Sequence, residues 1–197
     1  MPFLNDGRRE YRDVEAVFRA KPESYIVEGY ATTFDAPYNF GETGAKEQIS
    51  SRALKDADMS DVIFQLNHEG MVLARLRNDT LALKQDEHGL FVRADLSGSA
   101  QGRELYEAIK NGLIDRMSWG FSVAKDGWEW DEKTRTSTVT AVSKVYDVSA
   151  VSLPADEDTE IHARSYLDGV IELERKEFAE HDKERRHRMA LALKFTN

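Results

Sequence analysis

The chain has 197 residues, close to the length of one typical domain. Its 36 acidic residues outnumber its 27 basic ones and give a net charge of −9, a poor composition for non-specific binding of nucleic acid. Cysteine is absent, which excludes disulfide scaffolds, thiolate zinc sites and cysteine nucleophiles from this chain. The apolar stretches are only a few residues long, so no membrane span is predicted.

The first part of the chain predicts a hairpin followed by a loop. Residues 13–19 and 25–34 are rich in β-branched and aromatic residues, and residues 20–24 between them contain a proline and predict the connection. Residues 35–50 contain one proline and two glycines and predict a loop. A short helix capped by serine is expected at 51–57.

The middle of the chain predicts a buried strand, a hairpin and a helix. Residues 61–68 read as a strand that runs into an exposed end, and residues 80–86 and 90–96 alternate apolar and polar positions around a glycine-containing turn. Residues 99–111 switch to a helical period, with Ser99 placed as the N-cap. Strand character then returns in four segments, 117–123, 128–133, 134–142 and 144–153.

These elements predict a mainly β (α+β) body, a sheet-rich barrel or sandwich with one central helix, over residues 1–165. The composition changes at about residue 166. Residues 166–197 are highly charged and favour helix, but their apolar residues do not keep to one face for long. We therefore expect a charged, helix-prone tail that is an appendage to the body.

His68 is the best-placed histidine for chemistry. It ends the strand predicted over 61–68 and precedes Glu69 and Gly70, where the backbone is expected to turn. A strand end that opens into a loop is a common position for a catalytic side chain, although a half-buried histidine with one hydrogen bond explains the same position. The other four histidines lie in turn or polar segments, and no spacing typical of a metal site is present.

Ser118 and Asp147 occupy unusual positions on two predicted strands. Ser118 precedes Gly120 by two residues, so unobstructed backbone lies beside its hydroxyl, as the close approach of a substrate requires. An ordinary strand with a small-residue face has the same pattern. Asp147 lies in VYDVSAV, where a carboxylate costs free energy unless it is paired. An imidazole N–H, a salt bridge to a basic side chain, or exposure at a sheet edge would each satisfy it.

Five blocks of sequence form a wider pattern, which covers roughly residues 10–160. They are GYATTFD (29–35), NHEG (67–70), HGLFVRADL (88–96), NGLIDRMSWGF (111–121) and VYDVSAVSLPA (145–155). In order and approximate spacing the blocks resemble the prohead maturation proteases of tailed bacteriophages, a family related in fold to the assemblin proteases of herpesviruses.

The resemblance implies a serine endopeptidase on a compact, assemblin-like β-barrel surrounded by a few helices. Matched residue by residue, Ser118 is the expected nucleophile and His68 the expected general base. Asp147 is expected to orient His68, at a position where the family usually has glutamate. No cofactor or metal is implied.

The resemblance also implies a setting for the reaction. Proteases of this kind act inside the phage prohead, in the host cell cytoplasm, where they cleave the scaffolding segment of the major capsid protein and then themselves. The major capsid protein is thus the expected partner, a homodimer is a further expectation, and no membrane or specific nucleic acid is implied. Residues 166–197 are the candidate targeting or self-cleaved segment.

Three other functions fit parts of the sequence. A non-catalytic capsid scaffolding module on the same fold would use Ser118, His68 and Asp147 only for packing. A hydrolase with paired carboxylates would use Glu69 and Asp147 instead of the serine. A nucleic-acid binder would use the short basic cluster at 185–188, which neighbouring acidic residues balance.

Overall fold

β-Strands dominate the part of the chain that the structure describes. A computed structural model describes residues 9–14, 19–21, 24–40 and 45–152. Its strands are β1 (Glu10–Val14), β2 (Arg19–Lys21), β3 (Ile26–Thr33), β4 (Tyr38–Phe40), β5 (Ala45–Ile49), β6 (Ile63–Leu66), β7 (Glu69–Arg75), β8 (Leu81–Gln85), β9 (Gly89–Asp95), β10 (Arg116–Val123), β11 (Trp128–Asp131), β12 (Thr136–Val139) and β13 (Val142–Val151). The helical elements in these residues are α1 (Ala100–Lys110) and a 3-10 turn, η1 (Leu76–Asn78).

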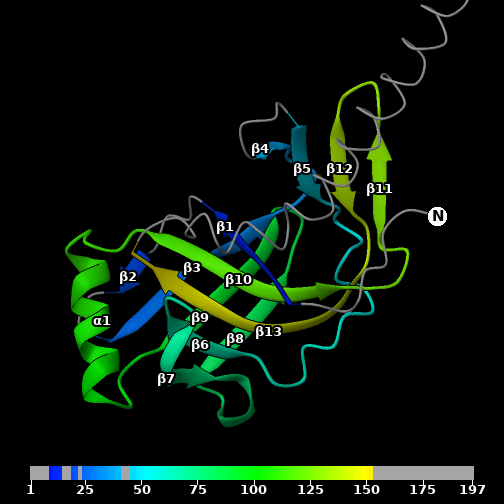
Figure 1. The fold of residues 1–197 in the computed structure, drawn as a ribbon. Helices are drawn as coiled ribbons and strands as arrows, with labels where there is room; N and C mark the ends of the chain where they lie inside the picture. The colour runs from blue at the N-terminus through cyan, green and yellow to red at the C-terminus, as the bar shows by residue number, and fades with distance from the viewer. Residues whose placement is uncertain (1–8, 15–18, 22–23, 41–44, 153–197) are drawn as a thin grey trace, which may run out of the picture. The chain divides into compact units, whose positions relative to one another are not determined.

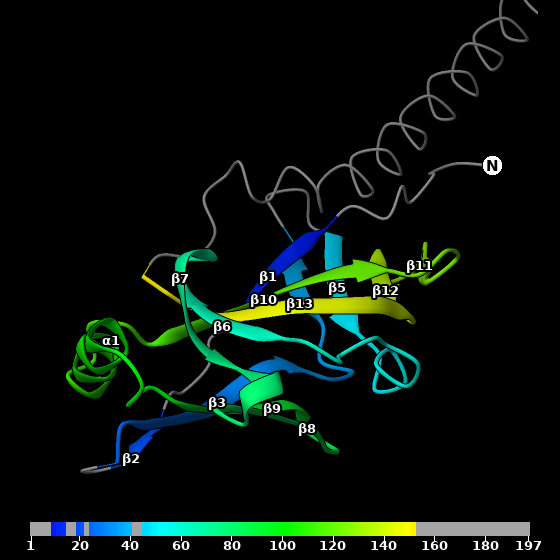
Figure 2. The ribbon, with the colours of Figure 1, turned by 90° about the horizontal axis from the view of Figure 1, so that it is seen from below.

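These strands form three sheets (Figure 1). One has five strands in the order β1-β10-β13-β6-β7, and the other two have the orders β2-β3-β9-β8 and β11-β12-β5-β4. The first two sheets lie as facing layers, with α1 at one end of them (Figure 2). The predicted mainly β fold is confirmed. The predicted barrel with several surrounding helices is not, because the described strands form open sheets and the described residues contain one α-helix.

The hydrophobic core lies between these two layers. Met117, Trp119 and Phe121 of β10 belong to the buried cluster together with Val27 of β3 and Val92 of β9. Because side chains alternate along a strand, Ser118, Gly120 and Ser122 lie on the other face of β10, as the sequence predicts. Burying three large side chains of one strand anchors β10 in the middle of its sheet and fixes its register.

Two sequence predictions in the middle of the chain are confirmed. The hairpin of β8 and β9 pairs Leu81 with Ala94 and Gln85 with Leu90. The hydroxyl of Ser99 accepts a hydrogen bond from the Gly102 N–H at 2.9 Å, so it caps α1 as expected.

The strand predicted over 13–19 is wrong in its pairing. Its first residues belong to β1, which pairs antiparallel with β10, more than 100 positions away in sequence. Its last residue begins β2, which pairs antiparallel with β3 as the predicted hairpin requires. The local pattern indicates extended backbone correctly, but it carries no information about which strand becomes the partner.

The predicted loop over 35–50 contains two strands, β4 and β5. The sequence pattern does not predict β5, because the central residue of this strand is the buried Glu47. The Glu47 carboxylate pairs with Arg12 of β1 and accepts a hydrogen bond from Tyr38 of β4. A glutamate that is completely buried breaks the apolar alternation by which strands are recognised.

The helix predicted over 51–57 is also wrong. The N–H groups of Ala53, Lys55 and Ala57 each bond to the carbonyl three residues earlier, which makes successive turns instead of α-helix. β7 was not predicted. Most of its residues are exposed, so it lacks the apolar alternation of a half-buried strand.

The predicted tail, residues 166–197, lies outside the described residues, and the boundary at 165 stays a prediction. Among the described residues, no helix has the length and hydrophobicity of a membrane-spanning segment.

Candidate active site

Ser118 and Asp147 lie on neighbouring central strands of the five-stranded sheet. Ser118 of β10 pairs with Ser149 of β13, and Gly120 pairs with Asp147. Paired residues of antiparallel strands place their side chains on the same face, and so do residues two apart along a strand. The hydroxyl of Ser118 and the carboxylate of Asp147 therefore project on the same side of the sheet, opposite the hydrophobic core.

His68 is brought to this face by a two-residue turn between β6 and β7. Asn67 and His68 both have positive φ angles, 52° and 59°, as the two central residues of a type I′ turn require. Asparagine and histidine adopt this left-handed conformation more readily than most residues. The turn lies two residues earlier than the sequence predicts, at Asn67-His68 and not at Glu69-Gly70.

Hydrogen bonds to β13 hold the turn in place. The Asn67 N–H donates to the carbonyl of Ala150 at 2.9 Å, and the His68 N–H donates to the hydroxyl of Ser149 at 3.2 Å. The Asn67 side-chain oxygen accepts from the N–H of Ser152 at 3.0 Å. These bonds offset the cost of the left-handed backbone and fix the direction of the imidazole.

The three predicted site residues form a continuous hydrogen-bonded row. Nε2 of His68 lies 2.7 Å from the Ser118 hydroxyl oxygen, and Nδ1 lies 2.9 and 3.0 Å from the two carboxylate oxygens of Asp147. The tautomer with its proton on Nδ1 donates to Asp147 and accepts from the serine O–H, and this makes both bonds at once. Ser118 and Asp147 are completely buried, and the His68 side chain is 12% exposed.

The Asp147 carboxylate also contacts a basic and aromatic group that the sequence did not reveal. The Arg9 guanidinium donates a hydrogen bond to Asp147, and it stacks over the rings of Tyr11 and Tyr146 at 5.1 and 4.8 Å from their centroids. Tyr11 also packs on the imidazole of His68, with 4.3 Å between ring centroids. Burial raises the pKa of the Tyr11 hydroxyl, and the Asp147 charge raises it further against the opposing effect of Arg9.

A β-bulge and a glycine make room for this arrangement. The pairing slips after Gly120, so that Phe121 pairs with Val145 and Tyr146 is the extra residue beside Asp147. A Cβ atom at Gly120 would lie only 2.6 Å from an Asp147 carboxylate oxygen. The sequence pattern predicted a close approach at Gly120, but the groups that approach it are the chain's own Asp147, Arg9 and Tyr11.

The structure thus brings Ser118, His68 and Asp147 together and decides between the explanations left open for Asp147, which is buried and bonded to both an imidazole and a guanidinium. Glu69, the other carboxylate considered, is exposed and is not among the hydrogen-bond partners of Asp147 within the described residues. No group of three or more His, Asp or Glu side chains in this part of the chain is placed to hold a metal ion.

Comparison with known proteins agrees with this geometry. The family model of the caudovirus prohead serine proteases matches residues 12–170. The chain belongs to this family. It is 30% identical over 164 residues to the prohead protease of Enterobacteria phage HK97, and the alignment covers 81% of this chain and 69% of that protein. The family assignment makes the protein a serine protease and gives it a role in the maturation of phage capsids.

Two residues of the site lie outside the segment that the family model matches. Arg9 and Tyr11 precede residue 12, where the match to the prohead proteases begins. No solved structure matches the chain, so the expected relation in fold to the assemblin proteases stays a prediction.

Proposed function

We propose that the protein hydrolyses peptide bonds through Ser118 as nucleophile and His68 as general base, with Asp147 orienting the imidazole. The observation that carries this proposal is the 2.7 Å contact between Nε2 of His68 and the Ser118 hydroxyl oxygen. A serine hydroxyl is almost fully protonated at neutral pH, so it attacks a carbonyl only when a base within hydrogen-bond reach accepts its proton.

The remaining steps use the same three groups. His68 takes the proton as the hydroxyl oxygen attacks the scissile carbonyl, and then gives it to the leaving amine. The ionised carboxylate of Asp147 keeps the Nδ1 proton in place and stabilises the imidazolium that forms between these two events. Water then enters, loses a proton to His68 and releases the acyl group, which restores the free serine.

Family membership supports a specific setting for this reaction. We infer that the substrate is the major capsid protein, cut in its scaffolding segment inside the prohead in the host cytoplasm, and that the protease also cuts itself. The relative in phage HK97 is named a prohead protease, in agreement with this setting. Residues 166–197 are the proposed docking or self-processed segment, and a homodimer is the proposed active form.

Intact-mass spectrometry over time tests the proposal with the purified full chain at two concentrations. Wild type is expected to shorten, and Ser118→Ala to stay whole, because removal of the triad serine costs on the order of 10⁴–10⁶ in rate. Ser122→Ala is the matched control, since Ser122 is a second buried serine on the same face of β10 and bonds to Ser143 instead of His68.

The same experiment separates the finer points. Fragments that end before residue 166 locate self-processing, and a first-order rate constant that rises with concentration indicates cleavage between molecules or within a dimer. Added capsid protein of the same phage supplies the external substrate. If wild type and Ser118→Ala behave identically with the capsid protein present, the non-catalytic scaffolding module is the better explanation.

A further inference from the structure

We propose that the apolar hollow between α1 and the β6–β7 hairpin is a substrate subsite that takes an apolar side chain within three residues of the scissile bond. This inference rests on the proposed function. The hollow has a volume of about 550 Å³. Its apolar lining comes from both walls: Leu66, Met71 and Leu73 from the hairpin, Leu105 and Ala108 from α1, and Ile114 from the segment that follows.

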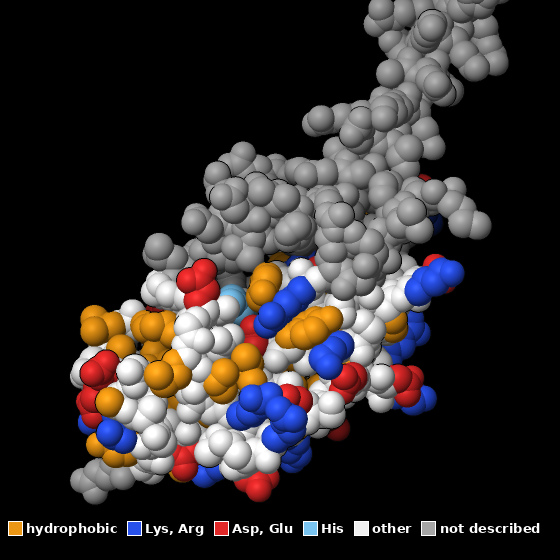
Figure 3. All heavy atoms as spheres, turned by 60° about the horizontal axis from the view of Figure 1, so that its bottom comes forward, with side chains coloured by type: hydrophobic (Ala, Val, Ile, Leu, Met, Phe, Trp, Pro, Cys, Tyr) orange, Lys and Arg blue, Asp and Glu red, His pale blue; other side chains and the backbone are white. Residues whose placement is uncertain are grey.

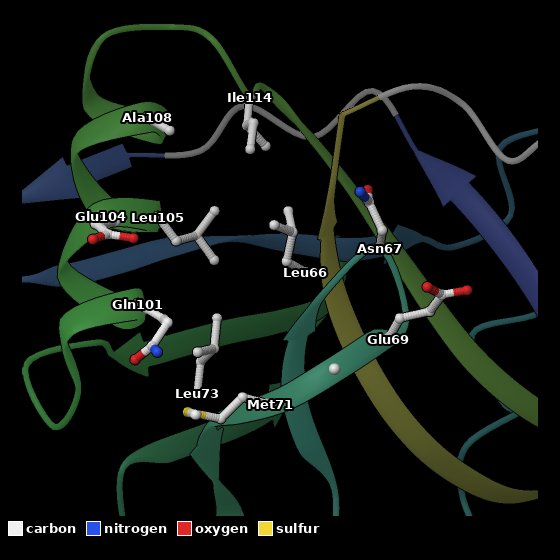
Figure 4. A pocket seen from close by; sticks show the side chains of 11 residues that line it. Leu66, Asn67, Glu69, Met71, Leu73, Gln101, Glu104, Leu105, Ala108 and Ile114 are labelled. Atoms are coloured by element: carbon white, nitrogen blue, oxygen red, sulfur yellow. The ribbon is translucent and has the colours of Figure 1, made fainter.

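The side chains converge on one space. Figure 4 shows Leu66, Leu73, Leu105 and Ile114 directed toward one another across the gap between hairpin and helix. A concave, mainly apolar site with a few polar groups at its edge is typical of ligand-binding pockets. The volume is sufficient for the side chain of a leucine, methionine or phenylalanine residue.

The hollow is continuous with the catalytic turn. Asn67 and Glu69, the residues on either side of His68, both belong to its lining. A peptide whose scissile carbonyl lies at the Ser118 hydroxyl also lies against the turn that carries His68, and the hollow begins at that turn. This continuity favours the substrate as occupant over a distant docking partner.

The rim of the hollow exposes large apolar side chains. Met71 is 54% exposed and Leu66 is 36% exposed, and Leu113, next to Ile114, is 75% exposed. Figure 3 shows hydrophobic side chains gathered at the left of the visible face, the side on which α1 lies in Figure 1. Exposed apolar side chains that gather around a hollow mark a binding site more often than single scattered ones do.

Charge restricts the occupant further. Glu69 and Glu104 are the ionisable residues of the lining, and both are exposed. They repel an acidic side chain and leave an apolar one unaffected. The subsite is therefore expected to accept leucine, methionine or phenylalanine and to reject aspartate and glutamate.

Cleavage-site profiling of a peptide library, made by digesting a proteome, tests the subsite in the full chain. Wild type is expected to enrich apolar residues at one fixed position within three residues of the cut. Met71→Asp puts a carboxylate into the hollow, and it should lower kcat/KM for those peptides by about tenfold or more, since one contact in an apolar pocket is worth about 10–200-fold. The same variant should raise the share of lysine and arginine at that position.

Val72→Asp is the matched control. Val72 is the next residue on β7, is also exposed, and faces away from the hollow because side chains alternate along a strand. A cut-site profile that stays unchanged in Met71→Asp, or that changes equally in both variants, overturns the subsite. A change in self-processing or oligomeric state alone assigns the hollow to another segment of this chain or to a second copy, and overturns it too.

A fluorophosphonate probe separates failure of the subsite from failure of the proposed function. The probe reacts with an activated serine and needs no peptide side chain in the hollow. Equal labelling of Ser118 in wild type, Met71→Asp and Val72→Asp is expected. If wild type is not labelled at Ser118, the proposed function fails. If labelling is intact and the profiles are identical, only the subsite fails.

Discussion

Replacing Gly120 by alanine tests whether the absence of a side chain at this position allows the Asp147 carboxylate to keep its place beside His68. A Cβ atom there would lie 2.6 Å from Oδ1 of Asp147, 2.8 Å from Nε of Arg9 and 2.9 Å from Cε1 of Tyr11. Ordinary van der Waals contact begins at 3.4 Å, so the carboxylate oxygen must retreat by about 0.8 Å. This displacement is enough to break its 2.9 Å hydrogen bond with Nδ1 of His68.

The expected loss of activity follows from that displacement. A misplacement of about 1 Å costs about 10²-fold in rate. Loss of the carboxylate that orients a triad histidine costs about 10⁴-fold. We therefore expect Gly120→Ala to lower the second-order rate of Ser118 labelling by a fluorophosphonate by about 10²–10⁴-fold, followed by intact mass. Overpacking should also lower the free energy of unfolding by about 1–3 kcal/mol.

Gly98→Ala is the control for this substitution. It makes the same chemical change at a glycine whose added Cβ would have no neighbour within 4 Å. It is expected to label at the wild-type rate. If Gly120→Ala also labels at the wild-type rate while it remains folded, then the position of Asp147 does not depend on this contact and the reasoning is wrong.

Three further predictions concern the surroundings of the site and the stability of the fold. Arg9→Gln removes the second group that fixes the Asp147 carboxylate and should slow Ser118 labelling about tenfold; an unchanged rate would make Arg9 irrelevant to the reaction. Glu47→Gln leaves the buried Arg12 guanidinium without its bidentate partner and should lower the free energy of unfolding in urea by about 3 kcal/mol. Hydrogen bonds from Lys144 and Arg75 hold the pKa values of Asp58 and Asp61 below their ordinary range, so the stability they contribute is present above about pH 4 and is lost as the pH falls through the lowered values. Urea midpoints measured between pH 6 and pH 2 should show this loss, and Asp58→Asn should reduce it.

The sequence predicted best where local pattern and burial agree. β10 and β13 are rich in β-branched and aromatic residues because both are buried in the middle of a sheet, and α1 has a clear cap at Ser99. The local positions of Ser118, His68 and Asp147 marked them as candidates, and the resemblance to the prohead proteases gave each a role. The hydrogen-bonded contacts among them depend on the pairing of distant strands, which no local pattern contains.

The places of Arg9 and Glu47 could not be predicted, because they depend on charged partners far away in sequence. Arg9 is one basic residue among many until β1 pairs with β10 and brings it to Asp147. Glu47 looks like a loop residue until Arg12 makes its burial favourable. In both cases the position of a charged side chain depends on a partner far away in sequence. Strand propensity and hydrophobic periodicity are local properties, so they do not identify such partners.

The large sequence separation of the residues around Asp147 affects when the enzyme can become active during its synthesis. Arg9 and Asp147, whose side chains are hydrogen-bonded, are separated by 138 positions, and His68 and Asp147 by 79. Contacts between such distant residues form slowly, because the chain loses the entropy of a large closed loop before it gains the contact. A ribosome-bound chain that has not yet released β13 lacks the carboxylate altogether. With the proposed triad, proteolytic activity is delayed until translation has passed the end of the sheet, which separates synthesis of the protease from its first cleavage.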